Sequence, residues 1–185
     1  MIVYLDTSVI LSYFDESSTF FPTTQKLLKF PNLELITGFI TVLEMESVIN
    51  RSFSSLSFQF DKEADKIFDL LSKSEKISAI TEYFLTHLEI RIESTASIEK
   101  YQMRGVKIDV YNTFQTALRI NRDLGLRTLD AIQIASAVEI RILNKVNVEF
   151  FVTNDKIILQ NKQNLFQKAR IVPISSEDLA RVLDV

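Results

Sequence analysis

Short apolar runs alternate along this chain with stretches in which apolar residues recur at helical spacing. Residues 2–5 read Ile-Val-Tyr-Leu, and the apolar residues of 9–14 that follow fall on helical positions. The same order returns at residues 33–37, before a helix from about Thr41, and at residues 148–153, before another helix. Strands separated by helices need crossover connections, which produce a mainly parallel sheet with helices on both faces. We therefore expect an α/β fold.

Other parts of the chain have weaker signals. Residues 52–105 are predicted to form an extra helical block of two or three helices, in which Ile77–Ile80 is either a brief strand or a connector. Gly125 is expected to end one helix, and Thr128 is expected to cap the next. A last strand is predicted over residues 169–174.

Length and composition favour one compact domain spanning residues 1–185. The chain has 46% hydrophobic residues and only three Gly and three Pro, so it contains no stretch with the composition of a linker. No apolar run reaches the ~18 residues of a membrane span, and the first run is interrupted by Asp6 with no basic segment before it. We therefore expect a cytoplasmic protein without a membrane partner.

Cysteine and histidine usage restricts the kinds of site that the chain can build. There is no cysteine, which excludes disulfides and thiolate metal sites, and the single His87 excludes any site that needs two imidazoles. We expect His87, which lies among apolar residues, to be structural or exposed. Any metal ion must be held mainly by oxygen ligands.

Four acidic residues are placed where a parallel sheet presents its binding edge. Asp6 follows the first strand and Asp155 follows the strand over residues 148–153. Glu44 lies near the start of the helix after the second strand, and Asp130 lies in the first turn of the helix that begins near residue 128. Ligands of such sheets bind beyond the carboxyl ends of the strands. We expect the four carboxylates to converge there.

Convergence of carboxylates is costly unless a cation lies between them. Two like charges ~4 Å apart repel by roughly 4 kcal/mol at an effective dielectric constant of about 20. Mg²⁺ and Mn²⁺ prefer oxygen ligands, and a bound ion can activate water for attack on a phosphodiester. The net charge of −3 argues against a broad basic surface for nucleic acid, although clustered acidic ligands lower the formal charge until a cation binds. Each acid alone is more often a helix cap or a solvated side chain, so the joint pattern carries the hypothesis.

Four short motifs, taken in order, resemble those of a known family. They are Ile-Val-Tyr-Leu-Asp-Thr-Ser at residues 2–8, Thr-Val-Leu-Glu at 41–44, Leu-Asp-Ala-Ile-Gln-Ile-Ala at 129–135 and Phe-Val-Thr-Asn-Asp at 151–155. Together they resemble the PIN domain, and most closely its VapC-like toxin ribonucleases. The resemblance implies a PIN-like three-layer fold.

The resemblance also implies a function and a set of site residues. It implies a metal-dependent endoribonuclease that hydrolyses RNA with Mg²⁺ or Mn²⁺, the toxin of a toxin–antitoxin pair, with an antitoxin protein and a second copy of the chain as partners. The metal ligands that it implies are Asp6, Glu44 and Asp130, with Asp155 as a fourth acid acting directly or through water. Ser8 and Thr153 would orient Asp6 and the hydrated ion.

Two departures and three rival functions complete the interpretation. The chain is longer than a compact toxin of this family, and the excess is expected in the block over residues 52–105. Gln133 stands where the family often has a histidine, and we interpret it as structural.

A catalytically inactive PIN-like module that binds RNA or protein stays open as the alternative. A small-phosphate hydrolase is disfavoured because Ser8 stands two residues after Asp6 instead of a second Asp, and no G-x-G-x-x-G motif for a dinucleotide follows the first strand.

Overall fold

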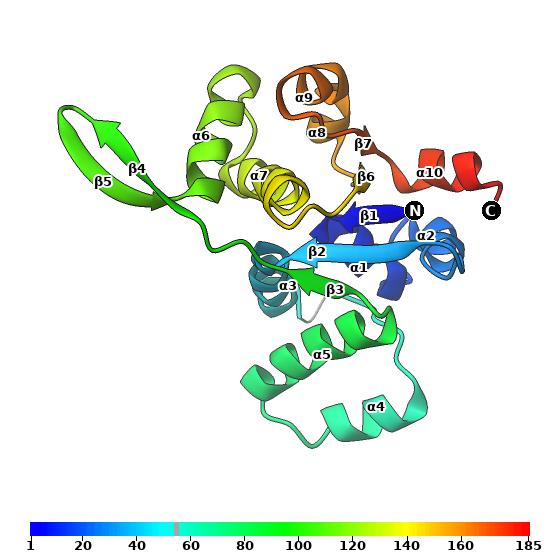
Figure 1. The fold of residues 1–185 in the computed structure, drawn as a ribbon. Coiled ribbons are helices and arrows are strands. Elements are labelled where there is room, and N and C mark those ends of the chain that lie inside the picture. The colour runs from blue at the N-terminus through cyan, green and yellow to red at the C-terminus, as the bar shows by residue number, and fades with distance from the viewer. Residues whose placement is uncertain (54–55) are drawn as a thin grey trace.

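The central sheet has five parallel strands. In this computed structural model, which describes residues 1–53 and 56–185, the strand order is β3-β2-β1-β6-β7, and every neighbouring pair is parallel (Figure 1). The strands are β1 (Ile2–Leu5), β2 (Glu34–Gly38), β3 (Arg91–Glu93), β6 (Val148–Val152) and β7 (Pro173–Ile174). The prediction of an α/β fold with a mainly parallel sheet is confirmed.

Helices cover both faces of this sheet. One face packs against α1 (Thr7–Phe14), α2 (Phe21–Leu27), α3 (Phe39–Ser52), α4 (Lys62–Phe68), α5 (Lys73–His87) and α10 (Ser176–Leu183). The other face packs against α6 (Asn112–Leu124), α7 (Thr128–Leu143), α8 (Lys156–Gln160) and α9 (Lys162–Ala169). Figure 1 shows the two layers below and above the sheet, so the predicted three-layer arrangement is present.

The side chains of β1 show why the sheet needs both layers. Val3 and Leu5 belong to the core on the side of α1, whereas Tyr4 belongs to the core on the side of α7, and none of the three is exposed. Successive side chains of a strand point to opposite faces, so a strand that is apolar at every position must be buried on both sides. β1 is therefore a central strand, and its carboxyl end lies in the middle of the sheet edge.

An aromatic cluster attaches the additional helices to the core. The rings of Phe14 in α1 and Phe84 in α5 are stacked with centroids 3.7 Å apart, and Phe60, Phe68 and Tyr83 pack around them. Aromatic rings bury large apolar areas, which makes such a cluster a strong anchor for short helices. Residues 56–88 therefore form part of the hydrophobic core.

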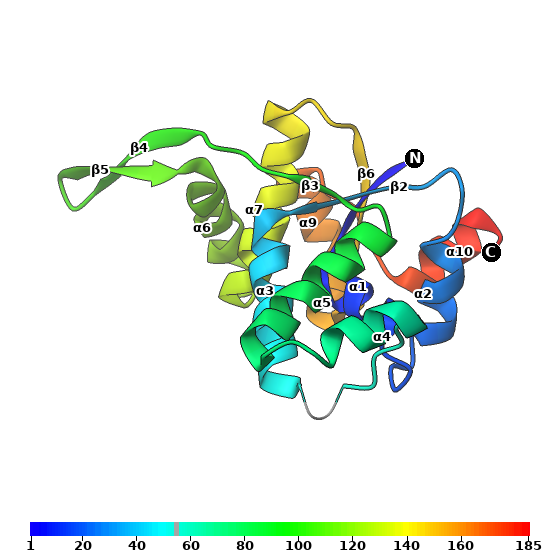
Figure 2. The same ribbon diagram turned by 90° about the horizontal axis from the view of Figure 1, so that it is seen from below.

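The structure corrects the prediction of helices up to residue 105. Helix ends at His87, and the chain continues as β3, then as a hairpin of β4 (Ile98–Met103) and β5 (Val106–Tyr111). In β5 the β-branched residues Val106, Ile108 and Val110 recur at alternate positions, and β4 and β5 are joined by a two-residue turn, Arg104-Gly105, with both φ angles positive. The hairpin projects away from the rest of the molecule in Figures 1 and 2.

Three other boundaries differ from the predictions. Ile77–Ile80 lies inside α5, because Ser72 and Glu75 form a capping box that starts a helix before this run. Arg127, not Thr128, is the N-cap residue of α7. The last strand is only Pro173–Ile174, because α9 continues through Ala169 and then ends in a left-handed residue.

No helix in the described residues combines the length and the apolar composition needed to cross a bilayer.

Candidate active site

The four acids that the sequence singled out line one cavity. Its volume is about 260 Å³, and it lies beyond the carboxyl ends of β1 and β6, where α1, α3, α7 and α8 begin or pass. Besides the acids, Thr7, Ser8 and Arg127 reach its wall, together with two apolar residues. The convergence expected from strand and helix positions is present in the structure.

Asp6 is held at the end of β1 by hydroxyl groups. Its backbone N–H donates to the Val152 carbonyl, 3.0 Å away, which continues the pairing of β1 with β6. The hydroxyls of Ser8 and Thr153 both donate to Oδ2 of Asp6, at 2.8 and 2.6 Å. Asp6 precedes α1 but makes no side-chain capping bond to it. The carboxylate is therefore oriented by side chains, and only 7% of the residue is exposed.

Glu44 reaches the cavity from α3 and is positioned by two neighbours. Thr7 Oγ1 donates to its Oε2 at 2.8 Å, and Gln133 Nε2 from α7 donates to the same oxygen. Gln133 also donates to Thr7 Oγ1 at 3.0 Å and is almost completely buried. These bonds connect α1, α3 and α7 directly behind the cavity.

Asp130 has a buried oxygen without a partner. It lies in the first turn of α7, and its Oδ2 has no hydrogen bond although the atom is inaccessible to solvent. Buried polar atoms are nearly always paired, because an unpaired carboxylate oxygen loses its hydration without compensation. An unpaired oxygen in a cavity lined by three other acids indicates a place for a cationic ligand.

Asp155 divides its oxygens between a helix cap and an arginine. Oδ1 accepts hydrogen bonds from the backbone N–H groups of Ile157 and Ile158, at 2.7 and 3.2 Å, and so caps α8. Oδ2 lies 4.0 Å from Nη1 of Arg127. Arg127 therefore stands at the site, and in the part of the chain that the structure describes it is the one cation that lines this cavity.

The electrostatics of the site oppose full ionisation of the acids. Burial raises the pKa of Asp6 to about 6, and the charges of Glu44 and Asp130 add to this effect, while the hydroxyls of Thr153 and Ser8 oppose it. Burial likewise raises the pKa of Asp130 to about 6, with further contributions from Asp155 and Glu44 against the opposing charge of Arg127. Two acids with raised pKa values beside two more carboxylates are typical of a site that binds a cation.

The donor set suits a hard divalent cation, but the acids do not enclose one ion in their present positions. Among the described residues, no group of three or more acidic or histidine side chains stands close enough to hold a metal ion as arranged. Two contacts explain the spacing, because Glu44 is engaged by Gln133 and Asp155 by the amides of α8. Mg²⁺ commonly uses one or two protein carboxylates and keeps several waters, so the unpaired oxygen of Asp130 and the buried Asp6 fit such an ion.

The sequence interpretation undervalued two residues. Thr7 and Gln133 orient Glu44 through direct hydrogen bonds, whereas the sequence predicts only a structural role for Gln133. Their polar side chains stand at positions that face neighbouring elements, but a single sequence does not show which neighbour. Glu46, two residues after Glu44 in α3, does not line the cavity and accepts a hydrogen bond from Ser78 of α5.

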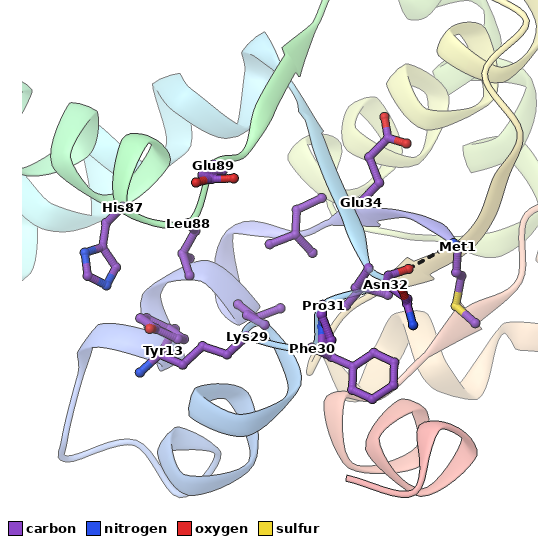
Figure 3. A pocket seen from close by; sticks show the side chains of 13 residues that line it. Met1, Tyr13, Lys29, Phe30, Pro31, Asn32, Glu34, His87, Leu88 and Glu89 are labelled. Carbon is purple, nitrogen blue, oxygen red and sulfur yellow. Dashed lines mark hydrogen bonds between the residues drawn. The ribbon is translucent and has the colours of Figure 1, made fainter.

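A larger hollow lies at the opposite, amino-terminal edge of the sheet. Its volume is about 640 Å³, and Figure 3 shows Lys29, His87 and Glu34 around it, with Met1, the residue before β1. Glu34 is paired with Arg91, at 2.8 Å. None of the four predicted acids reaches this hollow, so its size alone does not make it the site of chemistry.

Fold and site together define an α/β protein with an acidic cavity at the carboxyl edge of a parallel sheet. The PIN domain profile matches residues 3–163, and the chain belongs to the PIN domain family, whose members are generally nucleases. Among solved structures, the VapBC2 complex from Rickettsia felis bound to a DNA fragment from their promoter is similar in fold. The TM-score is 0.50 at 12% sequence identity, over 95% of this chain and 98% of that one. No curated protein sequence matches.

Proposed function

We propose that this chain is a divalent-metal-dependent endoribonuclease that uses Asp6, Glu44, Asp130 and Asp155 to hold Mg²⁺ or Mn²⁺. The observation that carries the proposal is the single cavity that the four acids share, in which Asp6 is buried and Asp130 has an unpaired oxygen. Among the described residues, Arg127 is the only cation that lines this cavity, so the negative charge of the four acids is far from balanced. A bound cation would remove the repulsion.

The residues have different roles in this proposal. Asp6, held by Ser8 and Thr153, and Asp130 would be the direct ligands, while Glu44 and Asp155 would act directly or through water. When bound, the ion supplies an activated water and stabilises the negative charge that grows on the phosphodiester. Arg127, exposed at the rim, can contact a substrate phosphate. Hydrolysis of this kind adds water across the P–O bond and leaves a 5′-phosphate and a 3′-hydroxyl.

The test is cleavage of a mixed RNA pool by wild type and by Asp6→Asn, each with Mg²⁺, with Mn²⁺ and with EDTA. We expect wild type to cut only with a metal ion and Asp6→Asn to lose at least about a hundredfold in rate, as loss of a group that stabilises transition-state charge commonly causes. Asp65→Asn is the matched control, because Asp65 is an exposed acid of α4 outside the cavity. Equal cutting by wild type and Asp6→Asn would refute the proposed site.

A catalytically inactive binding module is the second candidate. Two observations favour a binding module. Glu44 is already engaged by hydrogen bonds, and among the described residues no three acids stand close enough together to hold a metal ion. This hypothesis predicts that calorimetric titration of wild type with Mn²⁺ shows little or no heat of binding, and that RNA is bound but stays intact. Tight binding of Mn²⁺ that is lost in Asp130→Asn would argue for the nuclease.

We further propose that the nuclease acts in the cytoplasm as the toxin of a toxin–antitoxin pair, with an antitoxin protein and a second copy of the chain as partners. The support is family membership together with the likeness in fold to a VapBC2 complex. Expression in a bacterial host should arrest growth, and Asp6→Asn should abolish the arrest at equal protein level. Growth arrest that persists in Asp6→Asn would show that the effect does not come from this site.

A further inference from the structure

The β4–β5 hairpin has an exposed edge with unused hydrogen-bonding groups. The two strands pair only with each other, in a two-stranded sheet apart from the central one. Both views show the hairpin projecting from the body, so neither outer edge is covered over most of its length (Figures 1 and 2). An edge strand of this kind is a template for pairing with another strand.

The hairpin register shows which groups of β5 point outward. Ile108 lies opposite Tyr101, and the N–H of Asn112 bonds the carbonyl of Ser97, 2.9 Å away. In an antiparallel pair, inward-bonding residues alternate along each strand with outward-facing ones. The backbone groups of Ile108 and Val110 therefore bond inward to β4, and those of Lys107 and Asp109 point to the free edge.

One face of the hairpin is mostly apolar. Residues opposite each other share a face, so Tyr101, Val106, Ile108 and Val110 lie on one side of it, together with Glu99. Val106 is 60% exposed and Ile108 is 42% exposed. The face is only partly covered, because the Tyr101 hydroxyl accepts a hydrogen bond from Arg122 of α6 at 3.2 Å. A two-stranded hairpin with little cover is only marginally stable in isolation. Pairing with further strands would therefore stabilise the β4–β5 hairpin.

The sequence of β5 is complementary to itself. When two copies are set antiparallel about Ile108, Lys107 of each stands opposite Asp109 of the other, and Val106 stands opposite Val110. These are the residues whose backbone groups face outward, so the charge pairs and the backbone bonds occur in one register. Lys107 and Asp109 form no ion pair within the described residues, although Lys100 of β4 stands opposite Asp109 in the hairpin.

The free edge of β4 lacks this complementarity. The central residue of β4 whose backbone groups point outward is Lys100. In antiparallel self-pairings centred at residues 99, 101 and 100, Lys100 would stand opposite Ile98, Gln102 and another Lys100, respectively. Like charges directly opposite are destabilising, and the other two pairings contribute no charge attraction. The charge pattern therefore selects β5 as the pairing edge.

We propose that two copies of this chain associate through their β5 edges, forming an antiparallel four-stranded sheet in the order β4-β5-β5-β4 with Ile108 on the two-fold axis. The contact is isologous, because the same residues serve on both sides. It gives a surface to the second copy expected as a partner, and it does not depend on nuclease activity. The interface is small for a permanent dimer, so we expect a micromolar dissociation constant.

Charge reversal tests the register in solution. Analytical ultracentrifugation should show wild type dimerising with concentration, while Lys107→Asp and Asp109→Lys each weaken the dimer by roughly tenfold or more. An equimolar mixture of the two variants should dimerise again, because each strand then meets opposite charge. Recovery on mixing, together with far-ultraviolet circular dichroism of each variant, excludes misfolding as the cause. Lys66→Asp, an exposed lysine of α4, is the control and should leave the dimer intact.

A single cysteine gives an independent test, because the chain has none of its own. Directly opposed residues that do not exchange backbone bonds have Cα atoms about 4.5 Å apart, within the range of a disulfide. Ile108→Cys should therefore form a covalent dimer under mild oxidation, whereas Val106→Cys, on the same face of the same strand, should not. A monomeric wild type, dimers unaffected by either charge reversal, failure of the mixture to dimerise, or equal cross-linking of the two cysteine variants would each overturn the proposal.

Discussion

At the scale of single residues, the site depends on side chains that orient the acids as well as on the acids. Ser8 and Thr153 hold one oxygen of Asp6, and Thr7 and Gln133 hold one oxygen of Glu44. Hydroxyl and amide donors fix a carboxylate without neutralising it, so its charge stays available to a ligand. The two sets of donors therefore prepare the cavity for a cation.

Removing the charge of Asp130 should stabilise the metal-free protein. The folded pKa values of Asp6 and Asp130, about 6, lie above the model-peptide value of 3.8, so the folded state binds more protons than the unfolded state between these limits. Stability contributed by the protonated forms is fully present below pH 4 and is lost as pH rises through 6. At pH 8 without metal, Asp130→Asn should exceed wild type in urea unfolding by roughly 1–2 kcal/mol, a value reduced for solvent screening because Asp130 is only half-buried, and the difference should shrink at pH 4. A less stable variant at pH 8 would contradict this electrostatic account.

Gln133→Leu tests whether the buried amide of Gln133 positions Glu44 for metal binding. Leucine has a similar volume but donates nothing, so Thr7 and Glu44 lose a shared partner. We expect a loss of roughly 1–3 kcal/mol in stability and weaker Mn²⁺ binding by calorimetry. Gln163→Leu on the exposed side of α9 is the matched control and should change neither quantity. Unchanged Mn²⁺ affinity in Gln133→Leu would show that Glu44 does not need this bond.

At the scale of elements, the site requires α7 to pass close to β2. Gly38 ends β2 and precedes α3, the helix that carries Glu44. A Cβ atom added at Gly38 would overlap Ser136 Oγ of α7 and lie 2.7 Å from the Tyr4 hydroxyl oxygen. Glycine is therefore needed here for the close approach of strand and helix.

Gly38→Ala should push β2 and α7 apart. Overpacking of a closely packed contact typically costs 1–3 kcal/mol, so we expect about that loss in chemical unfolding. The double variant Gly38→Ala with Ser136→Ala should recover part of the loss, because the nearest obstructing atom is then removed. If Gly38→Ala is as stable as wild type, the contact between these elements is looser than the structure indicates.

At the scale of the whole molecule, the acids come from four separate parts of the chain. Asp6 follows β1, Glu44 lies in α3, Asp130 in α7, and Asp155 follows β6. A ligand that binds the folded state alone stabilises it by about 2.7 kcal/mol at a concentration of 100 times its dissociation constant. A cation shared by these residues would therefore couple local binding to global stability.

Saturating Mn²⁺ should raise the thermal midpoint of wild type by several degrees, and EDTA should reverse the shift. Asp6→Asn should show little or no shift, because it removes the buried ligand. Differential scanning fluorimetry measures both, with Ca²⁺ as a comparison for ions of other size. An equal Mn²⁺ shift in wild type and Asp6→Asn would place the ion elsewhere.

The sequence by itself determined the parallel α/β fold and the positions of the four acids along it. Both follow from local patterns, because the periodicity of apolar residues identifies strands and helices, and strand ends specify the binding edge. A single domain over residues 1–185 stays a prediction. Other features depended on tertiary structure: the hairpin of residues 98–111, the contacts of Gln133 and Thr7 with Glu44, and the place of Arg127 at the cavity. The contacts of Gln133, Thr7 and Arg127 join residues far apart in the chain, and local periodicity carries no information about which distant side chains meet. The hairpin is local, but the alternation in β5 covers only residues 106–110, too short a run to stand out from the helical pattern before it.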